Sequence, residues 1–405
     1  MSDESAVELG TLGLDGGAHV LVRLALADRA TGEVVAVRGS HPDLDAHLAA
    51  WCRSEGHRWR GADGDGVSEA AAGIVGWIER GPSAGARWTG AERAGDPDGA
   101  IPAERAEPTW GLAARGAAVE PGGPTPRFAL DRRDEIWSDR AGSLAAQAMA
   151  AQWDPDEAID WSVPIDNPPE VEAAVVQVMT FLIENEEAAL VVPARFLGQV
   201  HPHFREIQTV LAFTLADEAR HVEVFTRRLR IGGGVPALST VGGRASLQTL
   251  LDEPDFAVAA FLLSVMGEGT FVSLLSFLER HAPDPLTRRI AARTRADEAR
   301  HVAFSLAHLE RHVTVEPGLR SRLAAAVEAR HRALQHTAGL NAEVFDALVL
   351  LAAGAATPEA VRTGWERVQD LQRDMADGRR TRLARLGFTA GEAEAIADLH
   401  TRNFM

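Results

Sequence analysis

Two residue types are absent from this chain of 405 residues, and a third occurs only once. There is no lysine and no tyrosine, which excludes a Schiff-base lysine, a phosphate-loop lysine and a tyrosyl radical. The single cysteine, Cys52, can form no disulfide within the chain and excludes a metal site with several thiolate ligands. These absences remove several common catalytic devices and favour a reducing compartment.

Basic charge and long apolar runs are also scarce. Acidic residues outnumber basic ones by 58 to 41, and the net charge of -17 argues against a nucleic-acid or anionic-membrane partner. The longest apolar runs, such as 257–266 and 347–353, are too short to span a bilayer. The first ten residues, MSDESAVELG, lack the apolar core of a signal peptide. We therefore expect a soluble, cytoplasmic protein that binds neither membranes nor nucleic acid.

The composition changes twice along the chain, which predicts three parts. Residues 1–80 show an α/β pattern, with a Val-rich strand at 33–37 and helical spacing at 44–52. Residues 81–127 are rich in Gly, Pro and Ala, as in GPSAGARWTG and EPGGPTP, and predict a linker. Residues 128–405 have helical periodicity throughout.

Nine strong helical segments are expected in the third part, separated by stops such as GGGVP and APDP. They cover about 140–152, 168–197, 203–230, 256–281, 285–313, 317–338, 341–353, 357–385 and 389–402. Four of them are long and adjacent, which predicts an antiparallel bundle.

One charged phrase occurs twice in this helical part. The sequences TLADEARHV (214–222) and TRADEARHV (294–302) share seven consecutive identical residues. Each places a Glu and a His three residues apart on one helix face, Glu218 with His221 and Glu298 with His301. The first pair falls on an apolar stripe and so faces the bundle interior. Because a buried carboxylate is costly unless it is paired or bound to a metal, the two pairs predict a common cation.

The neighbouring helices supply further carboxylates at inward positions. Glu268 lies on the apolar stripe of Phe261, Val265 and Leu275. In FLIENEEAALVV, one apolar stripe contains Glu186 and another contains Glu187. Periodicity does not choose between these two residues.

The complete set alternates a single Glu with Glu-x-x-His over four successive helices. Its members are Glu186 or Glu187, Glu218, His221, Glu268, Glu298 and His301. This is the ligand set of ferritin-like di-iron and di-manganese carboxylate bundles. Hard carboxylates with one imidazole per metal favour iron or manganese, so we expect two Fe ions, or a Mn/Fe pair, roughly 3.5–4 Å apart.

Over about residues 140–310 the chain resembles the oxygen-activating branch of the ferritin-like di-iron carboxylate superfamily. That branch includes the small subunit of ribonucleotide reductase, bacterial multicomponent monooxygenases and aryl-amine N-oxygenases. Its motif is often Asp-Glu-x-Arg-His, which matches 217–221 and 297–301 here. The resemblance implies a mainly α fold, a ferritin-like four-helix bundle with extra helices. It also implies that Asp217 and Asp297 hold the ligand imidazoles crosswise.

Residues 12–61 resemble the TusA-like sulfur-carrier family, a small α/β fold with the order β-α-β-α-β-β. The family motif is Leu-Gly-Leu-x-Cys-Pro-x-Pro, and here Gly16 stands where the cysteine belongs. Persulfide transfer by the usual residue is therefore excluded. Cys52 is expected to be a small buried residue rather than a nucleophile.

These features predict an enzyme, an O2-activating non-haem di-iron oxidase or oxygenase that hydroxylates, N-oxygenates or desaturates a small organic substrate. O2 is the co-substrate, and a ferredoxin or flavoprotein donates electrons, because the chain has no other redox-cofactor motif. We expect a closed, mostly apolar cavity beside the metals, with Thr214 and Thr294 as candidate lining residues. Gly269 is expected either to make room in this cavity or to allow tight packing between helices.

Two other functions are compatible with the same ligands. One is a ferritin-type protein that binds and oxidises iron, and the other is a non-catalytic adaptor with a structural di-metal site. The assembly is left open between a monomer and a homodimer.

Overall fold

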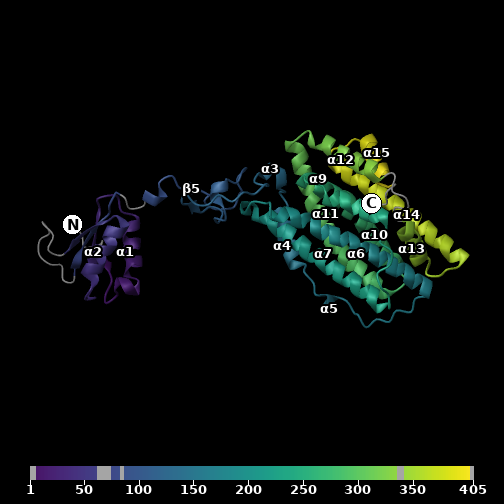
Figure 1. The fold of residues 1–405 in the computed structure, drawn as a ribbon, viewed down its shortest axis with the longest axis horizontal. Helices are drawn as coiled ribbons and strands as arrows, with labels where there is room; N and C mark the ends of the chain where they lie inside the picture. The colour runs from purple at the N-terminus through teal and green to yellow at the C-terminus, as the bar shows by residue number, and fades with distance from the viewer. Residues whose placement is uncertain (1–5, 62–73, 83–85, 335–341, 402–405) are drawn as a thin grey trace. The chain divides into compact units, whose positions relative to one another are not determined.

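A computed structural model of the protein describes residues 6–61, 74–82, 86–334 and 342–401. The chain forms two compact units, Met1–Arg93 with Ala118–Pro124, and Ala94–Ala117 with Thr125–Met405 (Figure 1). Within the expected linker, 83–85 lie outside the described residues. So do 335–338, 341 and 402, at the ends of three expected helices.

The first unit has the β-α-β-α-β-β order expected from the sequence. Its elements are β1 (Ala6–Glu8), η1 (Leu14–Gly16), α1 (Ala18–Ala27), β2 (Val34–Arg38), α2 (Leu44–Glu55), β3 (Arg58–Gly61) and β4 (Ile74–Glu79). The strands form one sheet in the order β1-β2-β4-β3, in which only the β1–β2 pair is parallel. Gly17 takes a left-handed φ of 101° between η1 and α1, a conformation that favours glycine.

The core of the first unit lies between the sheet and its two helices. Val35 and Val37 alternate along β2 and are both fully buried, so they point to the same face. Residues of both α1 and α2 join them in one apolar cluster, including Cys52. Burial raises the pKa of the Cys52 thiol to about 12, which keeps it protonated and unreactive at neutral pH.

The segment predicted as a linker contributes to both units. It contains η2 (Ala86–Trp88), β5 (Glu92–Arg93), η3 (Pro108–Trp110) and β6 (Ala118–Val119), and β5 pairs with β6. Residues 94–117 belong to the helical unit, where Arg115 contacts Glu206 at 2.6 Å. The backbone N–H of Ala103 also donates to Nε2 of His203. This part of the chain is therefore packed structure rather than a free connector.

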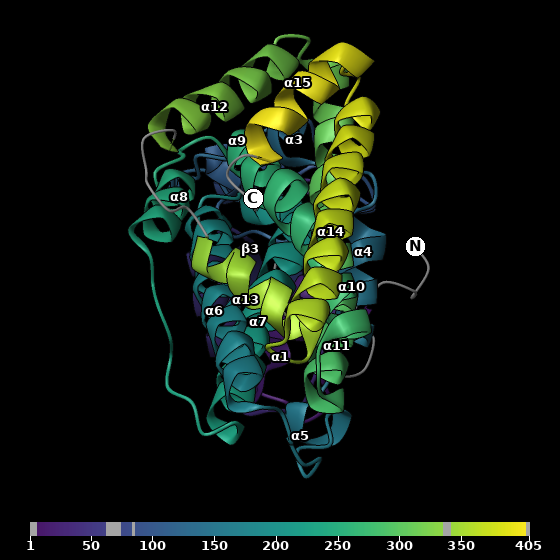
Figure 2. The same ribbon diagram turned by 90° about the vertical axis from the view of Figure 1, so that its right-hand side faces the viewer.

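The second unit is mainly α and contains the expected four-helix bundle with additional helices. Its elements are α3 (Arg133–Ile136), α4 (Ala141–Ala150), α5 (Pro155–Ala158), α6 (Pro169–Leu197), η4 (Pro202–Phe204), α7 (Arg205–Ile231), α8 (Val241–Leu251), α9 (Phe256–Ala260), the π-helix η5 (Phe261–Glu268), α10 (Gly269–His281), α11 (Pro285–Val315), α12 (Leu319–Leu334), α13 (Ala342–Ala353), α14 (Pro358–Arg385) and α15 (Ala390–Thr401). The bundle consists of α6, α7, α11 and the continuous helix α9–η5–α10 (Figure 2).

Local signals define the ends of the bundle helices. Pro169 begins α6 at a position where a missing N–H costs nothing, and Gly232 follows the end of α7. Asp284 caps α11 by accepting the N–H of Thr287 at 2.7 Å. Arg228 of α7, fully buried, binds Glu172 of α6 at 2.6 Å and Asp284 at 2.8 Å. One buried ion network therefore joins three bundle helices at one end.

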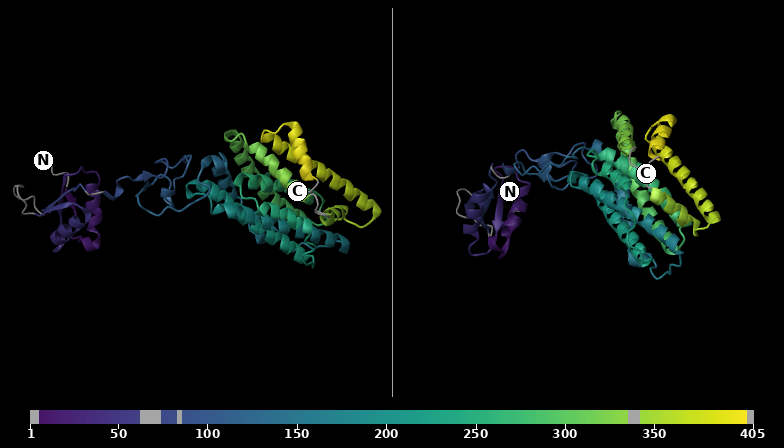
Figure 3. Two further views of the ribbon diagram at one scale, coloured as in Figure 1. Left: turned by 45° about the horizontal axis from the view of Figure 1, so that its top comes forward. Right: turned by 45° about the vertical axis from the view of Figure 1, so that its right-hand side comes forward.

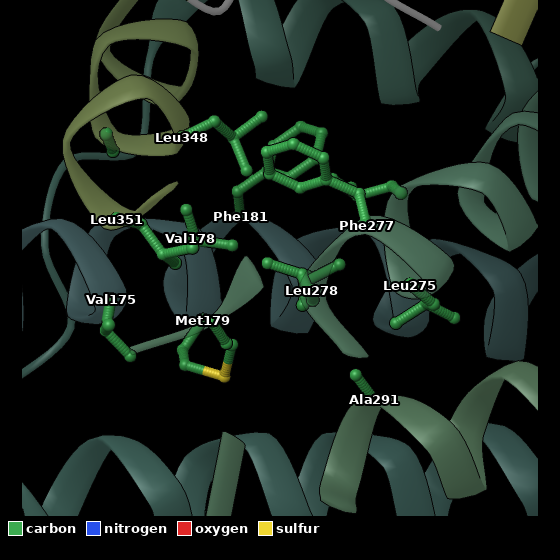
Figure 4. Close-up of a cluster of buried hydrophobic side chains, with 14 of the residues drawn as sticks. Val175, Val178, Met179, Phe181, Leu275, Phe277, Leu278, Ala291, Leu348 and Leu351 are labelled. Atoms are coloured by element: carbon green, nitrogen blue, oxygen red, sulfur yellow. The ribbon is translucent and has the colours of Figure 1, made fainter. Parts of the chain in front are cut away.

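One apolar core cluster contains residues from all four bundle helices and extends to the outer helices α13 and α14. Figure 4 shows Val178 and Phe181 of α6, Phe277 of α10 and Leu348 of α13 facing one another. α13 packs on α6, and α14 packs on α10. In both panels of Figure 3 the yellow helices α14 and α15 lie on the outside of the unit. The extra helices thus close the bundle on the side of α6 and α10.

The helical unit differs from the sequence-based expectation at α8 and in the helix at 256–281. Helix α8 was not expected, because Gly242 and Gly243 weaken its helical signal, although Thr240 caps it through the N–H of Gly243. The helix at 256–281 was expected to be regular but contains the π-helical turns of η5, which end at Glu268.

The expectation that no segment could span a bilayer needs amending. Helix Phe256–His281 is long and apolar enough by composition, and 78% of its most apolar window is buried inside the protein. α13 and α14 pass the same test only if the two bent helices are taken as one span. Glu268 lies within Phe256–His281, so we interpret this segment as the core helix of the bundle.

Candidate metal centre

The structure brings together six of the seven ligand candidates. Their donor atoms form two overlapping groups, each with all atoms within 4.8 Å of one another. The first group contains Glu186, Glu218, His221 and Glu298, and the second contains Glu218, Glu268, Glu298 and His301. Glu218 and Glu298 belong to both groups, so they can bridge two ions. Glu186 with His221 and Glu268 with His301 complete the two ends.

The open choice between Glu186 and Glu187 is decided by burial. Glu186 is 2% exposed and lies in the first group, whereas Glu187 is exposed and lies in neither group. Successive helical residues are rotated by about 100°, so one of two adjacent residues turns away whenever the other points inward. Glu187 is therefore not one of the six donors.

Each candidate ligand histidine is oriented by an aspartate from the opposite repeat. Nε2 of His221 lies 3.2 Å from Oδ2 of Asp297, and Nε2 of His301 lies 3.2 Å from Oδ2 of Asp217. This is the crosswise arrangement that the resemblance implied. Because Nε2 faces the aspartate, Nδ1 of each ring faces the carboxylates, at 3.1 Å from Glu218 for His221 and 3.0 Å for His301.

The two aspartates are themselves held by residues that the sequence analysis did not select. Trp153 donates its indole N–H to Asp297 at 2.8 Å, and Gln152 donates to Asp217 at 2.9 Å. Arg300 donates to Asp217 at 3.1 Å, and Arg220 contacts Asp297 at 3.4 Å. The two arginines are part of the repeated phrase, so their repetition was a usable signal. Nothing in the sequence pointed to Gln152 or Trp153.

The protonation behaviour of the site reflects crowding of acids in a dry interior. Burial, and then the charges of Glu218 and Glu298, raise the pKa of Glu186 well above its usual range. Burial, followed by the charge of Glu298, does the same to the pKa of Glu268. Burial alone would lower the pKa of His221, but its contacts with Asp297 and the glutamates raise it strongly. The cluster of glutamates and histidines therefore strongly favours positive charge between its side chains.

The residues present fit a pair of divalent cations. Oε1 of Glu186 and both carboxylate oxygens of Glu268 are buried and make no hydrogen bond to any described residue. Such atoms are costly unless something else satisfies them. Four ionised glutamates carry four negative charges, and two divalent ions neutralise them. Carboxylate oxygens with one imidazole per ion suit iron or manganese.

Two cavities lie next to the donor cluster. Cavity A is lined by Asn185, Glu186, Ala189, Leu247, Leu250, Leu262, Leu263, Gly267, Glu268, Phe271, Glu298 and Arg330. Cavity B is lined by Val192, Pro193, Phe196, Leu211, Thr214, Phe256, Ala259, Ala260, Leu263, Ser264, Glu268, His301, Phe304 and Ser305. They enclose about 410 and 430 Å³ of empty space, open solvent at their mouths included. Of this, about 30 and 40 Å³ admits the centre of a water molecule.

The cavities match part of the expected pocket. Their walls are mostly apolar, and Thr214 lines cavity B, whereas Thr294 lines neither of the two. Of the two roles expected for Gly269, the structure shows tight packing between helices, and Gly269 lines neither cavity. A Cβ at this position would lie 2.4 Å from the guanidinium of Arg382 in α14, so the glycine makes room for that side chain instead.

A four-helix bundle with a single Glu alternating with Glu-x-x-His is the arrangement of ferritin-like di-metal carboxylate proteins. Comparison of the chain with known proteins adds little to what the geometry of the site shows. No protein-family model matches the chain, and no curated protein matches it. The TusA-like resemblance of the first unit therefore stays a prediction.

Solved structures of two kinds are similar in fold. One is a protein from Synechococcus with aldehyde deformylating oxidase activity, 19% identical with a TM-score of 0.43, covering 56% of this chain and 96% of that chain. Another is a variant of R2-like ligand-binding oxidase with an aerobically reconstituted Mn/Fe cofactor, 16% identical with a TM-score of 0.43, covering 66% and 93%. At these scores the likeness carries no argument, so the assignment of the site depends on its own atoms.

Proposed function

We propose that the protein is an O2-activating non-haem di-iron, or Mn/Fe, oxidase or oxygenase that acts on a small organic substrate. The observation that carries this proposal is the pair of overlapping four-donor groups that share Glu218 and Glu298. Two bound ions would supply the electrons that reduce O2 and the oxidising power that acts on the substrate. Such a site could catalyse hydroxylation, N-oxygenation or desaturation.

The chain's own residues hold this centre and shield it. Asp217 and Asp297 fix the rings of His301 and His221, so that Nδ1 of each ring faces the glutamates that would hold the ions. Glu268 lines both cavities, so a substrate in either one would lie beside the same end of the site. The mostly apolar walls of the cavities leave little room for water, which would limit side reactions at the centre.

An external electron donor, such as a ferredoxin or flavoprotein, belongs to this proposal. A shallow surface depression is lined by Gln152, Trp153 and Arg220. Trp153 contacts Asp297, and Asp297 contacts His221, so one chain of hydrogen bonds joins the depression to a metal ligand. We propose that the donor binds there, and that the protein is cytoplasmic, where such donors and reduced thiols are found.

Metal content and O2 uptake, measured together, test the proposal. After anaerobic loading we expect about two iron or manganese ions per chain. Iron uptake should saturate there, and O2 uptake should then depend on both a reductant and an organic substrate. Fe(II) oxidation that continues far beyond this ratio without either would instead establish iron storage. Full loading without any O2 uptake, whatever the substrate, would favour the adaptor.

A further inference from the structure

Arg330 of α12 is a buried cation without an acidic partner among the described residues. Its side chain donates to Oγ1 of Thr249 at 2.8 Å, to Oγ of Ser246 at 2.5 Å and to the carbonyl of Ser246 at 3.3 Å. All three acceptors are neutral and belong to α8. Arg330 is 5% exposed, and burial lowers its pKa to about 10, still high enough to keep the charge at neutral pH.

Two other buried arginines have acidic partners, in contrast to Arg330. Buried Arg228 is neutralised by Glu172 and Asp284, and buried Arg300 contacts Asp217 and Asp297. Arg382 binds the carbonyl of Val265 and lines neither cavity. A buried charge without a counter-ion is costly, so an uncompensated arginine at a cavity wall calls for an anion.

Arg330 lines cavity A together with the metal-ligand candidates Glu186, Glu268 and Glu298. The rest of the wall is mainly leucine and phenylalanine, namely Leu247, Leu250, Leu262, Leu263 and Phe271. One cavity thus combines a fixed cation, an apolar surface and the edge of the metal centre. A molecule that satisfies all three has an anionic head and an apolar body.

We propose that cavity A binds an organic carboxylate, with the guanidinium of Arg330 holding the carboxylate group and the apolar body lying against the leucines beside Glu268. The planar guanidinium matches a carboxylate in two parallel hydrogen bonds. This inference rests on the proposed function in one respect, that the bound acid is the substrate. The binding itself does not require metal.

Calorimetry on the full-length, metal-free protein tests the binding. The probes are butyrate, octanoate and dodecanoate, with octan-1-ol and octylamine as neutral and cationic counterparts of octanoate. We expect at least one acid to bind more tightly than its alcohol or amine. Arg330→Met should weaken that acid by about tenfold or more and leave octan-1-ol within about twofold. Arg330→Lys should retain part of the preference for the acid, because it keeps the charge but not the planar fork.

The matched control is Arg332→Met on the same helix, where the side chain is 63% exposed and pairs with Glu328. This variant should bind the acid as the wild type does. If Arg330→Met does not fold, Arg330→Lys and the acid-against-alcohol comparison in the wild type carry the test. No acid binding by the wild type, or equal acid affinity in Arg330→Met, would overturn the proposal and leave Arg330 as a link between α8 and α12.

Metal analysis of the same samples separates this inference from the proposed function. Acid binding through Arg330 in a protein that takes up no metal leaves the carboxylate site intact and removes the oxidase. A metal-loaded protein with substrate-dependent O2 uptake but no preference for acids would support the oxidase and overturn the carboxylate site.

Discussion

Glu298 and Glu187 show how one residue's position decides its chemistry. Both are glutamates on bundle helices, each between an acidic residue and an alanine in the sequence. Glu298 is 1% exposed and belongs to both donor groups, whereas Glu187 is exposed and belongs to neither. The difference is the rotation of each side chain about its own helix axis.

Glu298→Ala should lose at least one of the two ions, because this carboxylate is shared by both donor groups. The remaining donors cannot fill either coordination shell as before. Metal analysis after anaerobic loading measures the effect, and circular dichroism checks the fold. Glu187→Ala is the matched control and should keep full occupancy. Full occupancy in Glu298→Ala, or an equal loss in both variants, would contradict the assignment.

At the scale of elements, the π-helix η5 positions Glu268 and depends on a helix far along the chain. π-helical turns are rare and often mark functional sites. Here Nε of Arg382, from α14, donates to the carbonyl of Val265 within η5 at 2.7 Å. The hydroxyl of Thr270 donates to the carbonyl of Met266 at 2.7 Å. Side chains thus satisfy carbonyl groups of the irregular turns, and Gly269 leaves space for the guanidinium of Arg382.

Gly269→Ala should therefore destabilise the protein, by about 1–3 kcal/mol, although alanine usually favours a helix. The added Cβ would lie 2.4 Å from the guanidinium of Arg382 and displace it from Val265. Thermal or urea unfolding measures the change. Gly391→Ala in α15 is the control, since a Cβ there meets nothing within 4 Å, and it should be neutral or stabilising. The same response in both variants would show that the contact with Arg382 is unimportant.

At the scale of the whole molecule, the boundary between the units differs from the composition boundary. The Gly/Pro-rich segment was expected to be a linker up to residue 127, yet 94–117 packs within the helical unit. Arg115 makes two hydrogen bonds to the carboxylate of Glu206, at 2.9 and 2.6 Å, near the start of α7. Composition reports the absence of regular secondary structure, not the absence of packing.

A shortened chain beginning at Ala94 should fold and load metal like the full protein, because all six donors and Arg115 remain. A chain beginning at Phe128 should still bind metal but be less stable, by about 1–3 kcal/mol, since Glu206 and His203 lose their partners. Unfolding curves and metal analysis of the two fragments provide the measurement. Equal stability would show that 94–117 adds nothing. Loss of metal by the Ala94 fragment would show that the first unit is needed for the site.

The sequence by itself determined the mainly helical class of the second unit and most of the candidate ligands. The repeat of ADEARHV placed Glu218, His221, Glu298 and His301, and the apolar stripe through Glu268 placed a fifth donor. The structure brings these five side chains together, as their spacing indicates, because helical periodicity is local and spacing along the chain already fixes which side chains share a face. The order of elements in the first unit is the one that the resemblance of residues 12–61 implied.

Only the tertiary structure decided what depends on contacts between distant segments. It selected Glu186 over Glu187, placed Trp153 on Asp297 and brought Arg382 to the π-helix. It also placed Arg330, more than 140 residues after Glu186, on the same cavity wall. No local pattern encodes such pairs, because the spacing between helices is set by how their side chains pack and not by the sequence of either helix alone.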